Sequence, residues 1–108
     1  MTAWKDRSDF KNAVYNWAEK LDIKVISLYL RPMKNKWASC SEKGHLNFND
    51  ELLSIDRILG EYVIVHELLH LRAANHGMLW KSYMSAYLPE WEELDRKLKR
   101  ITEKERGL

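Results

Sequence analysis

Hydrophobic residues near the start of the chain recur at the spacing of a helix with one buried face. From Ser8 to Leu21 they are separated by steps of three and four residues: Phe10, Ala13, Val14, Trp17, Ala18 and Leu21. Residues at these intervals share one side of an α-helix. Ser8 is a residue type that caps helix N-termini. We therefore predict a helix from Ser8 to Leu21 that backs a sheet.

The next segment carries the pattern of a β-strand. Residues 23–30 are rich in β-branched and aromatic side chains, with apolar ones on both faces, and the segment ends before Pro32. This composition is typical of a strand covered on both sides, and proline ends a strand because it cannot donate to the ladder. We therefore predict a buried strand from Ile23 to Leu30.

A hairpin is predicted over residues 33–49. Its arms are Trp37–Cys40 and Leu46–Asn49, and Gly44 in the connecting turn supplies the positive φ that tight turns need. Apolar and polar side chains alternate along the second arm, so that the polar ones share one face: His45, Asn47 and Asn49. For the first two of these we expect a hydrated face of the hairpin, with a position beside a cleft as the alternative.

A long apolar helix is predicted from Arg57 to Ala74. Asp56 precedes it and can cap its N-terminus. Apolar side chains fill most of its middle, as in a helix that is buried on most sides. Two histidines and a glutamate nevertheless lie within it: His66, Glu67 and His70. Such polar groups are unfavourable there unless they are paired or bound to a metal ion, so this conflict marks a candidate site.

These three residues form the pattern H-E-x-x-H. In a helix His66 and His70 lie one above the other, because each residue advances the helix by about 100°. Two imidazoles so placed can bind one Zn²⁺ at about 2.0–2.1 Å. Glu67 is placed as a base for the metal's water and not as a ligand. A metzincin would also need a glycine three residues after the second histidine, where this chain has Ala73.

A third histidine, His76, follows His70 after five intervening residues. On a straight helix it would face away from the other two, so it can join them only if the helix stops and the chain turns back. Asn75 and Gly77 flank it, and both residue types tolerate positive φ. We therefore predict a stop near Asn75 and three metal ligands: His66, His70 and His76.

Two further helices are predicted after the histidines. The first spans Leu79–Leu88. The second starts at Pro89, which is tolerated in a first turn, and carries an apolar stripe: Trp91, Leu94, Leu98 and Ile101. Three glutamates of this helix are rival third ligands, although we expect them on its solvated face: Glu90, Glu92 and Glu93. Its basic residues are interrupted by acidic ones, so we expect a solvated face there, with a nucleic-acid contact as the alternative: Arg96, Lys97, Lys99 and Arg100.

Length and composition fit a single domain over residues 1–108. The chain is 45% hydrophobic and 31% charged, as is usual in soluble proteins, and its net charge of +2 does not by itself indicate a nucleic-acid partner. It has one cysteine, Cys40, and therefore no internal disulfide. We expect Cys40 to be a small buried hydrophobe, with a thiolate on zinc as the alternative. No signal peptide or membrane span is visible, so a cytoplasmic protein is expected.

Four segments between Arg31 and Pro89 carry a more specific pattern. They are Met33-Lys34-x-x-Trp37-Ala38-Ser39-Cys40, Gly44-x-Leu46-x-Phe48-Asn49-x-x-Leu52, Tyr62-Val63-Ile64-Val65-His66-Glu67-Leu68-x-His70-Leu71 and Asn75-His76-Gly77-x-x-Trp80. Together they resemble the YgjP-like and SprT-like zinc metallopeptidases and, in size, the minimal zincins called minigluzincins. The resemblance implies an α+β minimal zincin fold, with an N-terminal backing helix, a small three-stranded sheet, a buried active-site helix and C-terminal helices. It also implies that His76 is the third zinc ligand.

These observations predict a zinc metallopeptidase acting on peptides or proteins. Glu67 is expected to take a proton from the zinc-activated water and pass it to the leaving amine. Zincins usually pair an extended substrate with an edge strand, for which the arm Leu46–Asn49 is the candidate. The candidates for stabilising the oxyanion are five: Tyr62, Tyr83, Tyr87, His45 and Asn47.

Two other classes stay open beside a peptidase that is active or latent. One is a zinc hydrolase of a non-peptide substrate, such as a nucleotide phosphoanhydride. The other is a non-catalytic binding or regulatory module, whose latent site would be covered by its own terminus.

Overall fold

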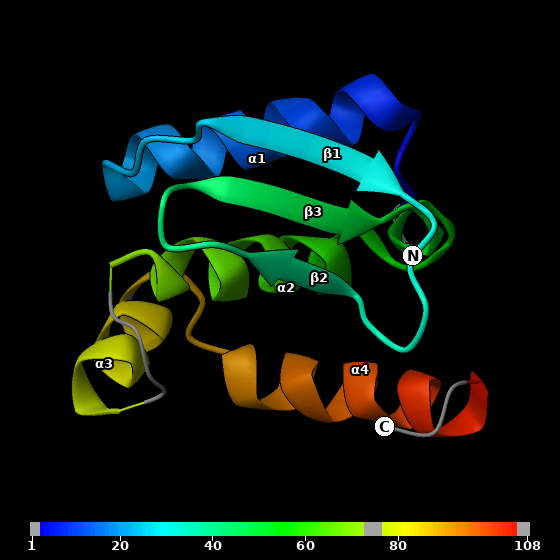
Figure 1. Ribbon diagram of the computed structural model, residues 1–108. Helices are drawn as coiled ribbons and strands as arrows, with labels where there is room; N and C mark the ends of the chain where they lie inside the picture. Colours follow the sequence, from blue (N-terminus) through cyan, green and yellow to red (C-terminus); the bar gives the residue numbers. More distant parts are fainter. Residues whose placement is uncertain (1–2, 73–76, 106–108) are drawn as a thin grey trace.

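The computed structural model describes residues 3–72 and 77–105, and it places helices against a three-stranded sheet (Figure 1). In chain order the elements are α1 (Arg7–Leu21), β1 (Ser27–Arg31), β2 (Ala38–Cys40), β3 (His45–Asn49), the 3-10 helix η1 (Asp50–Ser54), α2 (Arg57–His70), α3 (Met78–Tyr87) and α4 (Trp91–Glu105). The predicted α+β class, the three strands and the order of the helices are confirmed.

The central strand of the sheet is β3, because the strand order is β1-β3-β2. β1 runs parallel to β3, with Ser27 opposite His45. β2 runs antiparallel to β3, with Ser39 opposite Asn47, and the turn between them contains Gly44 at φ 101°. The hairpin prediction is therefore confirmed, and the pairing of β1 leaves β2 as the outer strand on the other side of β3.

β1 is shorter and more exposed than the sequence predicts. It begins at Ser27 and ends at Arg31, whereas the prediction ran from Ile23 to Leu30. Leu30 is 5% exposed but its neighbour Tyr29 is 58% exposed. The prediction of a strand covered on both faces is wrong, because α1 and α2 both lie on the same face of the sheet (Figure 1).

α1 backs the sheet as predicted, but its N-cap is Asp6 and not Ser8. The Asp6 carboxylate accepts a hydrogen bond from the Asp9 N–H at 2.8 Å, so the helix begins one residue before Ser8. The Phe10 ring packs edge-on against Phe48 of β3, with 5.3 Å between ring centroids. The helix thus covers the core face of the sheet.

α2 is the central helix of the core. Its apolar residues are buried except for Ile58, which is 37% exposed. The buried ones are Leu59, Tyr62, Val63, Ile64, Val65, Leu68 and Leu69. Asp56 is its N-cap residue, as predicted, although the Asp56 side chain makes no capping hydrogen bond. The helix ends at His70 and therefore before the predicted Ala74. The predicted turn at Asn75 and His76 lies outside the described residues.

The early end of α2 has a visible cause in the residues that follow it. The Leu71 and Arg72 N–H groups turn back to bond the Leu68 and Leu69 carbonyls, each at 3.0 Å. The Arg72 guanidinium donates to the carbonyls of Leu21 and Asp22 at the C-terminal end of α1, each at 2.6 Å. Cations suit the unsatisfied carbonyls at a helix C-terminus, so this contact ties the residues just after α2 to the end of α1.

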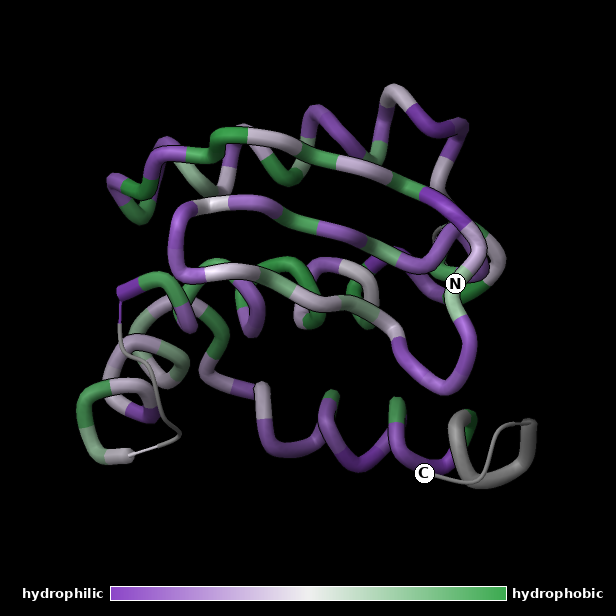
Figure 2. Tube along the Cα trace, in the orientation of Figure 1, coloured by the Kyte–Doolittle hydropathy of each residue, from purple (hydrophilic) through white to green (hydrophobic). Residues whose placement is uncertain are grey.

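Both predicted C-terminal helices are present, with shifted ends. α3 runs from Met78 to Tyr87, one residue earlier at each end than the predicted Leu79–Leu88. α4 starts at Trp91, so Pro89 precedes the helix and does not open it. The Trp91 N–H donates to the Leu88 carbonyl at 3.0 Å, so residues 88–91 form a turn that precedes the helix. The hydrophobic positions of α4 face the rest of the molecule, where it packs on α2 (Figure 2). Within 3–72 and 77–105 no helix is long and apolar enough to cross a membrane.

Candidate metal centre

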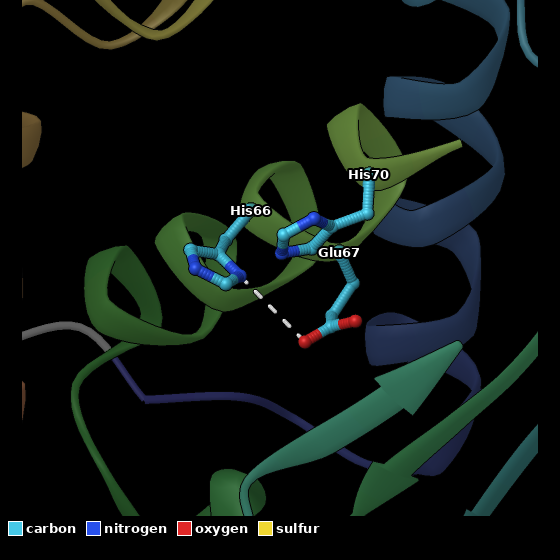
Figure 3. Close-up of side chains that lie close together, drawn as sticks. All are labelled: His66, Glu67 and His70. Carbon is cyan, nitrogen blue, oxygen red and sulfur yellow. Dashed lines mark ion pairs between the residues drawn. The ribbon is translucent and has the colours of Figure 1, made fainter. Parts of the chain in front are cut away.

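His66, Glu67 and His70 converge on one side of α2, with Glu67 pointing toward the sheet (Figure 3). One ligand atom from each residue lies within 4.8 Å of those of the other two. The two imidazole rings are 4.7 Å apart between centroids, as expected for residues one helical turn apart. The structure thus brings together two of the three predicted ligands and the predicted base, while His76 lies outside the described residues.

Two aromatic rings pack against these imidazoles. Trp80 of α3 lies 5.3 Å from the His66 ring and 6.4 Å from the His70 ring, between centroids. Tyr62, one turn before His66 on α2, lies 5.8 Å from the His66 ring. Both aromatic residues are buried, so they restrict the orientations open to the histidines. The segment Asn75-His76-Gly77-x-x-Trp80 was the signal in the sequence that could have placed Trp80 at the site.

The Glu67 carboxylate is mostly buried but has polar neighbours. Its side chain is 13% exposed, and its Oε1 lies 3.6 Å from Nδ1 of His66. Burial alone would raise the pKa of the Glu67 carboxyl, but the contacts with His66 and Cys40 and the charge of His70 together lower it. The carboxylate is therefore ionised at neutral pH, as a proton acceptor must be.

Cys40, at the end of β2, contacts Glu67 from the sheet. Both residues line one cavity, and burial together with the negative charge of Glu67 raises the pKa of the thiol to about 12. The thiol is therefore protonated at neutral pH, and Cys40 is not in the converging group formed by His66, Glu67 and His70 in the described part of the chain. The position of Cys40 outside this group does not support the alternative of a Cys40 thiolate on zinc.

Glu67 lines two open cavities, one toward each end of β2. The cavity of about 290 Å³ lies between β2, α2 and α4 and has apolar walls that include Trp37, Tyr62 and Leu98. The cavity of about 370 Å³ lies at the other end and is lined by Cys40, Glu42, Glu67, His70 and Leu71, among others. A cavity of about 390 Å³ at the ends of α1 and α2 contains no residue of the H-E-x-x-H motif, so we place the site at Glu67.

The strand beside these cavities is β2. The prediction that Leu46–Asn49 is the edge strand for an extended substrate is therefore wrong. Leu46–Asn49 belongs to β3, and β3 is already paired on both sides. Its main-chain groups are therefore committed to the ladder. The sequence alone did not reveal the pairing of β1 with β3, which turns the second arm of the hairpin into a central strand.

Asn49, at the end of β3, holds one wall of the smaller cavity. It is fully buried, and its side-chain amide donates to the carbonyls of Met33 at 3.0 Å and Lys36 at 2.8 Å. Lys36 and its neighbour Asn35 line the cavity beside His66. Asn49 therefore fixes the loop that leads into β2.

Three of the five predicted oxyanion partners lie elsewhere. His45 and Asn47 alternate with the core residues of β3, so they lie on the sheet face opposite α2. Tyr87 packs edge-on against a tryptophan of α1. Tyr62 lies beside His66, but its hydroxyl donates to the Asp95 carboxylate at 2.8 Å. Tyr83 is partly buried and packs against the core.

The rival glutamates of the last helix do not join the histidines. Glu90, Glu92 and Glu93 are exposed, and Glu93 lies 3.9 Å from Lys97. Among the described residues the converging group contains none of them. The expectation of a solvated glutamate face is confirmed.

Comparisons with known proteins point to one family. A model of the YgjP-like metallopeptidase domain matches residues 3–101. Over 108 residues the chain is 30% identical to an uncharacterized protein, MJ0123, of Methanocaldococcus jannaschii. The match covers 87% of this chain and 92% of that protein.

Two solved structures share the fold. The metallopeptidase zymogen jannalysin of Methanocaldococcus jannaschii matches with a TM-score of 0.76 and 31% identity, over 84% of this chain and 94% of that one. The metallopeptidase zymogen abylysin of Pyrococcus abyssi matches with a TM-score of 0.74 and 23% identity, over 92% of this chain and 98% of that one. At its lower identity the second likeness concerns the fold alone.

Proposed function

The chain belongs to the YgjP-like metallopeptidase family, and we propose that it is a zinc peptidase with Glu67 as general base. The observation that carries this proposal is the convergence of His66, Glu67 and His70 within 4.8 Å on the inner side of α2. The three residues open into cavities beside an outer strand, where a peptide can reach them.

The donor set suits zinc, since imidazole nitrogens are among its preferred ligands. His66 and His70 supply two, and we propose His76 as the third. Support for His76 comes from its place in the sequence just after a helix that ends at His70, and from the exposed positions of the rival glutamates around the start of α4. Zinc bound there would supply a Lewis acid that acidifies a water molecule and polarises the peptide carbonyl.

Glu67 then performs the proton transfers. Its carboxylate takes a proton from the water as the water attacks the carbonyl carbon, and gives that proton to the leaving nitrogen. The position of Glu67 supports this role, because it lies beside both histidines and faces the strand that would carry the substrate. The Glu67 carboxylate can carry out both proton transfers from its position on α2.

We propose that an extended peptide pairs with the outer edge of β2, which no other strand in residues 3–72 and 77–105 occupies. Antiparallel addition to Ala38–Cys40 would run the peptide past Glu67 and bring its side chains to the two cavities. The walls formed by Trp37, Tyr62 and Leu98 suit an apolar side chain in the smaller cavity. Peptide pairing here replaces the role that the sequence assigned to Leu46–Asn49.

Latency is part of the proposal. The jannalysin structure is of a zymogen, and α4 of this chain lines the smaller cavity through Asp95 and Leu98. A C-terminal helix in this position limits the room for a peptide beside His66. Peptidase activity that rises when the C-terminal helix is removed by limited proteolysis would support latency, and equal activity before and after would count against it.

Metal analysis and a substrate screen test the proposed function together. We expect about one zinc per chain in purified protein, and hydrolysis of casein-derived peptides but not of nucleoside triphosphates. Hydrolysis of the triphosphates alone would contradict the peptidase assignment. A protein that binds no zinc after equilibration with the metal would contradict the metal site itself.

A further inference from the structure

The contact between Cys40 and Glu67 joins the sheet to the active-site helix at the point where chemistry is proposed. Cys40 is paired with Leu46 in the β2–β3 ladder, and Leu46 is fully buried, so both side chains face the helices. α2 packs against β2 along this face. Cys40 and Glu67 line the same cavity beside His70, so the thiol lies within reach of the carboxylate.

A carboxylate used as a base needs a fixed direction. Glu67 is attached to α2 through a flexible side chain, and its neighbour on the helix, Nδ1 of His66, is 3.6 Å from Oε1, longer than a well-formed hydrogen bond. A donor on the facing strand can hold the carboxylate from a second element. Catalytic groups held from two elements keep the narrow geometry that proton transfer requires.

We propose that Cys40 is a positioning residue for the reaction, whose S–H donates to the Glu67 carboxylate and orients it toward the attacking water. The inference rests on the proposed role of Glu67 as general base. Cys40 does not touch the substrate's reacting atoms, and it acts only through Glu67.

The chemistry of a thiol suits this position. A thiol is a small, mostly apolar group that fits beside the buried core, and its S–H is a weak donor. A weak donor orients a carboxylate while leaving it able to accept a proton, whereas a cationic partner would hold the charge too firmly. The raised pKa of the thiol keeps the proton on sulfur, where it is needed for donation.

The hydrogen bond can be observed without zinc or substrate. Because Cys40 is the only cysteine of the chain, the S–H stretching band in the infrared spectrum of the metal-free protein comes from this residue alone. We expect Glu67→Ala to move the band to the position of a free thiol. Glu93→Ala, at an exposed carboxylate of α4, is the matched control and should leave the band in place. A band that is the same in wild type and Glu67→Ala would overturn the inference.

Kinetics test the positioning role. We expect Cys40→Ala to lower kcat by about 10- to 100-fold, the range of one hydrogen bond to a charged group, with KM and zinc content unchanged. Cys40→Ser keeps a donor and should restore kcat to within a few-fold of wild type. Equal kcat in wild type and Cys40→Ala would overturn the proposal, as would a folded, zinc-loaded Cys40→Ser that is as slow as Cys40→Ala.

The two failures are distinguishable. If wild type hydrolyses no peptide, the proposed function fails, while the infrared comparison still decides whether the thiol is bonded to Glu67. If wild type is active and Glu67→Gln is not, Glu67 is essential and the kinetics of the two Cys40 variants decide the inference. If Cys40→Ala does not fold, Cys40→Ser and the infrared band decide it.

Discussion

The Tyr62 hydroxyl donates a hydrogen bond to the Asp95 carboxylate at 2.8 Å and thereby joins α2 to α4. Tyr62 is 3% exposed, and Lys99 lies 2.9 Å from the same carboxylate. Burial and the Asp95 charge raise the pKa of Tyr62, so the phenol stays protonated and remains a donor. One side chain thus packs against the proposed zinc ligand His66 with its ring and holds the C-terminal helix with its hydroxyl.

Tyr62→Phe should weaken this link while preserving the packing of the ring. We expect a loss of about 1 kcal/mol in the free energy of unfolding, the usual net value of one hydrogen bond, measured by urea denaturation of the metal-free protein. Tyr15→Phe, at a tyrosine that is 51% exposed on α1, is the control and should change stability little. Equal stabilities for wild type and Tyr62→Phe would show that the bond contributes nothing.

Glu67→Gln should separate metal binding from turnover. The amide cannot accept the proton of the attacking water, so we expect a loss of about 10²- to 10⁴-fold in kcat with zinc content unchanged. Peptide hydrolysis and metal analysis on the same preparation check this. Glu93→Gln should retain full activity. Retained turnover in Glu67→Gln would remove Glu67 as the base.

The third ligand can be identified by zinc affinity. We expect His76→Ala to weaken zinc binding by at least about 100-fold in a chelator competition, since one of three protein ligands is lost. The triple variant of the rival glutamates, in which Glu90, Glu92 and Glu93 are all glutamine, should bind zinc as wild type does. The reverse pattern would assign the third ligand to α4.

Asp9 should make the stability of the fold depend on pH below neutrality. The Lys5 N–H and the Arg57 guanidinium bond its carboxylate, at 3.0 Å and 2.7 Å, and lower its pKa in the folded state. The folded state then binds fewer protons than the unfolded state, so this contribution is present above the ordinary pKa of about 3.8 and is lost as pH falls below it. The stability difference between wild type and Asp9→Asn should shrink from pH 6 to pH 3 in urea titrations. A constant difference would contradict this.

Gly60 of α2 lies directly beneath the Trp4 indole. A Cβ at Gly60 would lie 2.7 Å from the indole nitrogen and 2.8 Å from Cζ2 of Trp4. Although alanine is the better helix former, we expect Gly60→Ala to lower the free energy of unfolding by about 1–3 kcal/mol through this overlap. The same substitution in a Trp4→Ala background should be neutral or stabilising. Equal effects of Gly60→Ala in the two backgrounds would rule out the overlap.

The amino-acid sequence by itself determined the elements and the motif. Helical periodicity is a local property, so the apolar faces of α1 and α4 and the helix that carries His66 and His70 could be located from spacing alone. The glycine turn of the hairpin is local as well. The boundaries moved by a few residues where a side chain such as Asp6 or Arg72 supplied a competing hydrogen bond.

Only the tertiary structure decided which segments lie side by side. The parallel pairing of β1 with β3 joins residues far apart in the sequence, and it made Leu46–Asn49 a central strand and left β2 beside the site. The approach of Cys40 to Glu67 likewise depends on how α2 packs on the sheet. Such contacts arise from the burial of whole faces and not from local spacing, so no pattern along the chain could specify them.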